Sequence, residues 1–144
     1  MNTLQLSCNI ENTDPLLALG LLIRLNNIIV FDSDHVQETV TFTYDTEDEE
    51  GEHVLEFVMK NKTADHTKID TDGNIVKDAR IIISNLEFDA IDLTQVFISH
   101  AVYTHDFNGT KNKTQEKFYG EMGCNGIVSF KFNSPVYLWL LEHM

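Results

Sequence analysis

The chain has 144 residues, and its 42% hydrophobic and 23% charged side chains are ordinary fractions for a globular protein. Its 10 basic and 23 acidic residues give a formal net charge of −13 at pH 7. This excess of acid argues against nucleic-acid binding and against attachment to anionic membranes, because both depend on clustered Lys and Arg. The length favours one domain, residues 1–144, with a full hydrophobic core.

The first half of the chain consists of short segments in which apolar and polar residues alternate. Residues 3–10 alternate strictly, which predicts a half-buried strand. Residues 21–25 and 28–31 flank Asn26 and Asn27, and we expect a hairpin there because Asn tolerates the positive φ values of a tight turn. Two more strands are expected at residues 40–44 and 54–59.

The second half of the chain continues this pattern after an Asp-Gly turn signal at Asp72 and Gly73. Strands are expected at residues 81–83, 86–93, 96–103 and 128–132. Short strands at a spacing of about 8–12 residues, with almost no helical period, are typical of sandwiches and barrels. The sequence therefore predicts an all-β fold, a single antiparallel β-sandwich of jelly-roll-like type.

The ends of the chain and its two cysteines bear on the compartment. The first residues lack the basic and apolar segments of a signal peptide, and the apolar run at residues 15–23 is too short to cross a bilayer. Cys8 and Cys124 lie far apart and match neither a zinc framework nor a disulfide scaffold. We expect two buried free thiols, of which Cys8 behaves as a small hydrophobic residue.

Acidic segments raise the question of calcium, a cation that takes several oxygen ligands. Residues 45–52 are rich in carboxylates, but a solvated hairpin loop that protects a sheet edge is the favoured explanation. The segment around Gly73 resembles an EF-hand loop, except that its Gly is the fourth residue from Asp70 and not the sixth. Asp70, Asp72 and Asp78 are the candidate calcium ligands, and an ordinary turn is the alternative.

Few features of the sequence indicate catalysis. It has neither a Gly-x-Ser-x-Gly nucleophile elbow nor a Gly-rich phosphate loop. His100 and His105 would lie on opposite faces of a strand, which disfavours a shared metal ion. An acid/base pair of His105 and Asp106 is the remaining catalytic hypothesis, and the sequence predicts a protein that is not an enzyme.

The C-terminal segment, residues 135–144, is apolar on both faces of a strand. It could be a central strand covered on both sides, or a short helix with Tyr137, Leu140 and Leu141 on one stripe. A third interpretation is an exposed apolar face, which usually marks an interface. Burial in the core is favoured, and contact with a second copy of the chain is the accompanying hypothesis.

Polar and aromatic residues after the strand predicted at residues 96–103 are candidate ligand contacts. Planar amides and carboxylates pair with sugar hydroxyls, and exposed aromatic faces stack on sugar rings. The candidates are Tyr103, Asp106, Asn108, Asn112 and Tyr119. The alternative is that each of them is a turn residue beside a strand.

Parts of the chain resemble two groups of proteins. Residues 22–30, 40–42, 51–57, 61–80 and 86–91 are similar to β-sandwich carbohydrate-binding modules of the calcium-dependent xylan-binding type. Residues 103–109, 118–126 and 137–142 look like small uncharacterised proteins of marine T4-like cyanophages. The first resemblance implies carbohydrate as the partner and calcium as the cofactor. The second implies a virus-encoded binding or structural module that associates with the virion.

Two functions follow from these observations. The first is a non-catalytic binding module for carbohydrate, virus-encoded and calcium-dependent. The alternative is a virion structural or assembly protein that forms homo-oligomeric contacts through residues 135–144.

Overall fold

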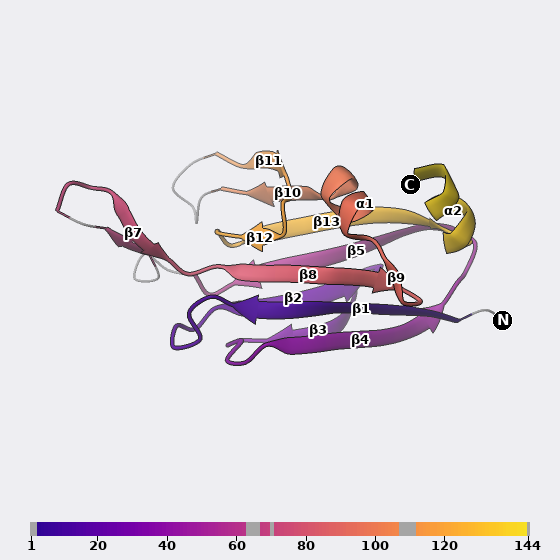
Figure 1. The fold of residues 1–144 in the computed structure, drawn as a ribbon, viewed down its shortest axis with the longest axis horizontal. Coiled ribbons are helices and arrows are strands. Elements are labelled where there is room, and N and C mark those ends of the chain that lie inside the picture. The colour runs from indigo at the N-terminus through magenta and orange to yellow at the C-terminus, as the bar shows by residue number, and fades with distance from the viewer. Residues whose placement is uncertain (1–2, 63–66, 70, 107–111, 144) are drawn as a thin grey trace.

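Two antiparallel β-sheets pack face to face in the computed structural model, which describes residues 3–62, 67–69, 71–106 and 112–143 (Figure 1). The strands are β1 (Thr3–Asn12), β2 (Gly20–Leu25), β3 (Ile28–Ser33), β4 (Val40–Glu47), β5 (Gly51–Lys60), β6 (Thr67–Ile69), β7 (Ile75–Asp78), β8 (Ile81–Phe88), β9 (Ile91–Asp92), β10 (Val102–His105), β11 (Thr114–Lys117), β12 (Glu121–Met122) and β13 (Gly126–Ser134). The helices are α1 (Thr94–His100) and α2 (Val136–His143).

The two sheets divide the strands unevenly. The β1 sheet has the strand order β12-β8-β1-β4, with β9 paired to β8, and the β5 sheet has the order β11-β10-β13-β5-β2-β3. A separate hairpin of β6 and β7 projects from the left of the sandwich in Figure 1. We call that side the loop end, where β5 finishes at Lys60 and β10 at His105. The opposite side, where β13 finishes at Ser134 and α2 follows, is the helix end.

The alternating segments form strands for the predicted reason. In β1, Leu4, Leu6, Cys8 and Ile10 are buried, while the residues between them face outward. Because successive side chains of a strand point to opposite faces, this alternation gives the sheet one apolar face that must be covered. The predicted antiparallel β-sandwich is confirmed, and so are the two free thiols and the burial of Cys8.

The predicted hairpin at residues 21–31 is also confirmed. β2 pairs with β3, and the turn residues Asn26 and Asn27 have φ values of 51° and 67°. The Asn26 side chain also accepts a hydrogen bond from the Val54 N–H at 2.9 Å, which ties the turn to β5. The turn therefore depends on Asn for its backbone conformation and for a side-chain contact.

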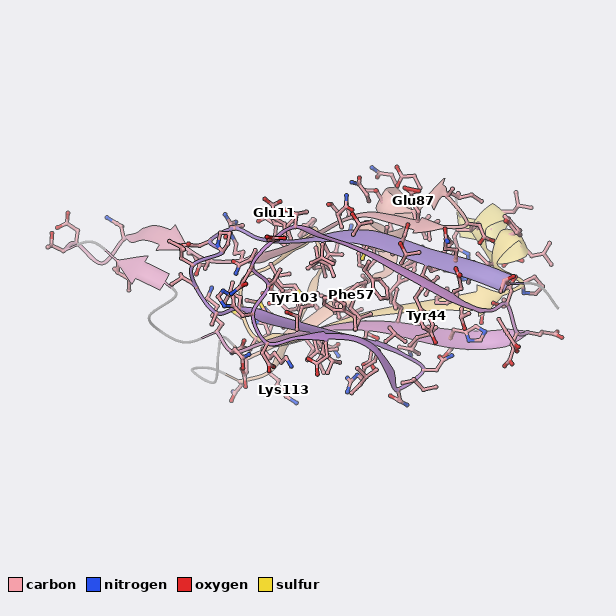
Figure 2. The ribbon with its side chains drawn as sticks, turned by 90° about the horizontal axis from the view of Figure 1, so that it is seen from below. Glu11, Tyr44, Phe57, Glu87, Tyr103 and Lys113 are labelled. Atoms are coloured by element: carbon pink, nitrogen blue, oxygen red, sulfur yellow. The ribbon has the colours of Figure 1, made fainter. Side chains whose placement is uncertain are left out.

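Aromatic side chains fill the space between the sheets. Phe88 of the β1 sheet packs edge-on against Phe132 of the β5 sheet, with ring centroids 4.8 Å apart. Phe57 and Phe130 are fully buried, and Phe97 contacts both. Figure 2 shows Phe57 between the two layers, while Glu11 and Glu87 lie on the outer side of the β1 sheet. These edge-on contacts add to the burial of apolar area.

The strand predicted at residues 96–103 is wrong over most of its length, because residues 94–100 form α1. Asp92 accepts hydrogen bonds from the Thr94 N–H at 2.8 Å and from Thr94 Oγ1 at 2.6 Å, and these bonds lower the pKa of Asp92. The helix turns Val96 and Phe97 toward the core together. Adjacent strand residues would point to opposite faces, so packing of this pair overrides the local β propensity.

The two strands predicted at residues 81–83 and 86–93 are instead one strand, β8, followed by the short strand β9. Asn85 has a φ of 54° and forms a bulge, since β1 and β8 shift register around it. The chain then turns at Asp89 and Ala90, both with positive φ. A bulge interrupts the alternation of a strand without ending it, which explains why the sequence pattern reads as two segments.

The C-terminal segment adopts the helical form among the alternatives considered. α2 buries Val136, Trp139 and Leu140, whereas Tyr137 and Leu141 are exposed. The predicted stripe of Tyr137, Leu140 and Leu141 lies on one side of α2, where the three residues line a hollow with Ile91, but only Leu140 of the three is buried. Within the described residues, neither helix has the length and apolar character that crossing a bilayer would require.

Candidate functional site

Tyr103, the first of the predicted ligand contacts, lies in the core and fastens a loop. Only 5% of the residue is exposed, and its ring packs on His105 with centroids 4.6 Å apart. Its hydroxyl donates to the Cys124 carbonyl and accepts from the Cys124 N–H at 2.9 Å. Figure 2 shows Tyr103 between the layers. Tyr103 thus holds the connection between β12 and β13 and keeps its ring faces within the protein.

The other predicted contacts fall in two places. Asp106 follows β10 and Asn112 precedes β11, so the antiparallel pairing of His105 with Thr114 brings both to the loop end. Asn108 lies outside the described residues. Tyr119 is 71% exposed but follows the opposite end of β11, where it lines a hollow of about 270 Å³ beside β8 and α1. The structure brings Asp106 and Asn112 together and leaves Tyr119 apart.

Of the candidate calcium ligands, the structure describes Asp72 and Asp78, which lie in different parts of the β6–β7 hairpin. Asp70 lies outside the described residues. Asp72 is in the turn at the tip of the hairpin, whereas Asp78 pairs with Thr67 at its base. Ile75 and Asp78 are three positions apart in β7, a span of about 10 Å, and calcium bonds are about 2.3–2.6 Å long. Asp72 and Asp78 therefore lie at opposite ends of the hairpin.

The surroundings of Asp78 also disfavour calcium. The Lys62 ammonium lies 2.5 Å from Asp78 Oδ1, so a positive charge already occupies that position. In the described residues, the acidic segment at 45–52 included, no three His, Cys, Asp or Glu side chains converge as a metal site would require. The residues of this chain at Asp78 do not fit calcium.

A groove of about 480 Å³ on the outer face of the β5 sheet is a candidate site. Its floor is formed by Ser129, Lys131 and Asn133, which alternate along β13 with residues that point into the core. Its remaining lining residues are Glu52, His100, Val102, Thr104, Gln115, Phe132, Trp139 and His143. We call it the β13 groove.

The β13 groove exists because one strand ends early. β10 pairs with β13 only over Gly126–Ser129, so Phe130–Ser134 continue past it. On that side, within the described part of the chain, α2 and the end of α1 cover this stretch instead of a strand. Where β10 ends and the two helices begin, a depression remains. Its floor is formed by β13 and its far wall by α1 and α2.

That far wall is aromatic. His143 stacks on Trp139 with centroids 4.5 Å apart and planes 26° apart, and His100 meets His143 edge-on at 5.1 Å. Trp139 is 6% exposed, so the two histidines present the accessible aromatic surface. His143 Nδ1 lies 2.7 Å from the Trp139 carbonyl. A carbonyl only accepts, so Nδ1 carries a proton and Nε2 of the neutral ring remains an acceptor.

A second hollow of about 260 Å³ lies at the helix end between the two sheets. Glu47 and Glu49 face each other there, and their hydrogen bond raises the pKa of Glu47. His53 receives a hydrogen bond from Asn26 Nδ2 at 2.9 Å and donates to the Glu49 carbonyl at 2.6 Å. Because these polar groups bond with one another, the hollow offers a ligand fewer open positions than the β13 groove.

Sequence reasoning did not find the β13 groove, although part of its signal was visible. Ser129, Lys131 and Asn133 are the polar members of an alternating strand, and such residues face outward. No pattern in the sequence indicated the aromatic wall of the groove. His100 and His143 are far apart in sequence, and only the packing of two helices brings them together.

Comparisons with known proteins bear on the fold. No family model matches the sequence, and no curated protein matches it significantly. The chain is similar in structure to the SeMet form of vCBM60, which is described together with two families of calcium-dependent carbohydrate binding modules. The sequence identity is 9% and the TM-score is 0.54, over 88% of this chain and 89% of that chain. vCBM60 in complex with galactobiose has 12% identity and a TM-score of 0.49, over 88% of this chain and 96% of that chain. The first likeness shows a shared β-sandwich fold.

Proposed function

We propose that this chain is a non-catalytic carbohydrate-binding module and that the β13 groove holds the sugar. One observation carries the proposal: a row of short polar side chains on an exposed sheet face runs beside an aromatic wall. The fold shared with vCBM60 is consistent with such a module and does not by itself assign a ligand.

The groove offers the groups that a sugar needs. Ser129 and Thr104 supply hydroxyls, and Gln115 and Asn133 supply amides; each both donates and accepts hydrogen bonds, as sugar hydroxyls do. The exposed ring of His143 offers an aromatic surface for the apolar face of a sugar ring. Neutral groups that donate and accept match a polyhydroxylated ligand better than an ion.

The same lining argues against sugar hydrolysis. Glycosidases that use two carboxylates hold them about 5–9.5 Å apart across the scissile bond. Among the described residues that line the groove, Glu52 is the only carboxylate. A groove with one carboxylate can bind a glycan but lacks the usual acid and base pair.

Calcium does not enter the proposal for this groove. The two families of carbohydrate binding modules with which vCBM60 is described are calcium-dependent. The lining here consists mainly of neutral groups, with one carboxylate at Glu52 and one positive charge at Lys131, whereas calcium prefers several carboxylate and carbonyl oxygens. We therefore expect the same affinity for a glycan in calcium and in a chelator.

A glycan array followed by titration calorimetry tests the proposal. Gln115→Ala and His143→Ala should each weaken binding of the best glycan about fivefold, the loss of one hydrogen bond or ring contact of about 1 kcal/mol. Gln37→Ala is the matched control, because Gln37 is exposed and is not part of the groove. An array without a positive glycan, or equal affinities for the groove variants and the control, would refute the proposal.

An assembly role is the second candidate function, and the exposed face of α2 favours it. Tyr137, Leu138 and Leu141 are 52%, 60% and 79% exposed. Tyr137, Leu140 and Leu141 line a hollow of about 320 Å³ with Ile91. Exposed apolar residues that cluster in this way are typical of contact surfaces, here with a second copy or with virion proteins.

Light scattering coupled to size-exclusion chromatography distinguishes this candidate from a monomeric module. An assembly protein should elute as an oligomer, and Leu141→Lys should convert it to a monomer. Leu16→Lys is the control, since Leu16 is 91% exposed in a loop away from α2. A monomeric wild-type protein at high concentration would eliminate homo-oligomeric assembly.

A further inference from the structure

The loop end of the sandwich contains an ammonium group inside a cage of oxygen atoms. Lys62 Nζ donates to Asp78 Oδ1 at 2.5 Å, to the Ala79 carbonyl at 2.9 Å and to the Gly123 carbonyl at 2.5 Å. The Lys62 side chain is only 1% exposed. A lysine with so little exposure requires partners for its charge and for each of its protons.

The three oxygens come from two separate connections. Asp78 ends β7 and Ala79 follows it in the connection to β8, while Gly123 lies in the connection from β12 to β13. An ammonium has three donors and no acceptor, so three oxygens satisfy it fully. One carboxylate and two backbone carbonyls are also ligand types that calcium takes in proteins. The cage therefore has the chemistry of a cation site, and a side chain of the protein fills it.

The backbone of Lys62 is fixed as well. Its N–H donates to Asn125 Oδ1 at 2.9 Å, and its carbonyl accepts from Asn125 Nδ2 at 2.8 Å. The Asn125 side chain thus pairs with the Lys62 backbone as a neighbouring strand residue would. This pairing holds Lys62 beside the connection that contains Gly123. A cation that entered the cage would have to displace this anchored side chain or lie against its positive charge.

We infer that the Lys62 ammonium is a built-in cation that fastens the β7–β8 and β12–β13 connections together, and that it supplies inside this oxygen cage the positive charge that a bound calcium ion would otherwise have to supply. The positive charge is delivered by the chain itself, so it does not depend on the calcium concentration. The inference is independent of the sugar site, because the β13 groove and the cage share no residue.

Lys60 provides a matched control two residues away. Its ammonium contacts Asp32 at 2.5 Å and Asp34 at 2.8 Å, so it too has carboxylate partners. Its side chain is 28% exposed, however, and its partners are 49% and 87% exposed. Exposed ion pairs contribute little because water screens them. Lys60→Met and Lys62→Met change the net charge equally and differ in the burial of the lost group.

Thermal unfolding in calcium and in a chelator tests the inference. We expect the wild-type Tm to be the same in both, a fall of about 6–20 °C for Lys62→Met, and a change within about 3 °C for Lys60→Met. Should Lys62→Met fail to fold, the wild-type Tm in calcium and in a chelator still tests whether a calcium ion stabilises the fold. A calcium-dependent rise in the wild-type Tm that Asp78→Asn abolishes would overturn the inference. Equal Tm values for the two lysine variants would overturn it too.

Discussion

Replacing Tyr103 with Phe removes one oxygen atom that bridges both backbone groups of Cys124. The ring stays in the core, so the loss is confined to the two hydrogen bonds. A polar group left without its partner costs about 1–3 kcal/mol, and Cys124 is half-buried, so water replaces the bonds only in part. We expect Tyr103→Phe to lower the free energy of unfolding by about 1–3 kcal/mol, and the Tm by about 4 °C per kcal/mol.

The effect of Tyr103→Phe on the free energy of unfolding should also depend on pH. Burial raises the pKa of the Tyr103 phenol above its ordinary value of 10.0. Because the folded-state pKa is above the unfolded one, the contribution of the neutral phenol to stability is complete below about pH 10. It is lost as the pH rises toward the folded-state pKa. The stability difference between the wild type and Tyr103→Phe should therefore shrink above about pH 10.

Urea unfolding followed by Trp139 fluorescence, at neutral pH and near pH 11, measures both effects. Tyr119→Phe is the control because Tyr119 is 71% exposed, and it should change stability by less than about 0.5 kcal/mol. If Tyr103→Phe is as stable as the wild type at neutral pH, the hydroxyl does not fasten the loop. A stability difference that grows above pH 10 would show that burial does not keep the phenol neutral.

Three further predictions concern the backbone and the thiols. Gly126→Ala should destabilise the fold by about 1–3 kcal/mol in urea unfolding, since an added Cβ would collide with the Thr104 carbonyl across the β10–β13 pair. Burial raises the pKa of Cys8 to about 12, so a thiol reagent should modify Cys124 in the native protein and Cys8 only after unfolding. Asn27→Val should cost about 1–2 kcal/mol, as a branched residue at a φ of 67° is strained, whereas Asn27→Gly should cost nothing measurable.

Elements that rest on local chemistry were predictable. The alternation of β1 decides which face is buried, and Asn26 and Asn27 decide where the β2–β3 hairpin turns. The loop candidates were recognised by residue type alone. Asp106 and Asn112 both lie at the loop end, yet the same reasoning chose Tyr103, whose ring is buried. Residue type does not reveal exposure in a two-layered fold.

Elements that rest on distant partners were not predictable. Residues 96–100 have the composition of a strand, but Phe97 packs among Phe57, Phe118 and Phe130, which come from three other parts of the chain. The helical geometry of α1 follows from that packing. The aromatic wall of the β13 groove has the same origin, because it requires α1 and α2 to cover the stretch that β10 leaves unpaired.

The sequence by itself determined the class of fold, the hairpin and the acidic surface, because alternation, turn residues and charge act over a few positions. Only the tertiary structure decided that Lys62 enters an oxygen cage and that two histidines flank a groove. Those sites join residues separated by about forty to sixty positions, such as Lys62 with Gly123 and His100 with His143. Their chemistry exists only after the sheets have packed.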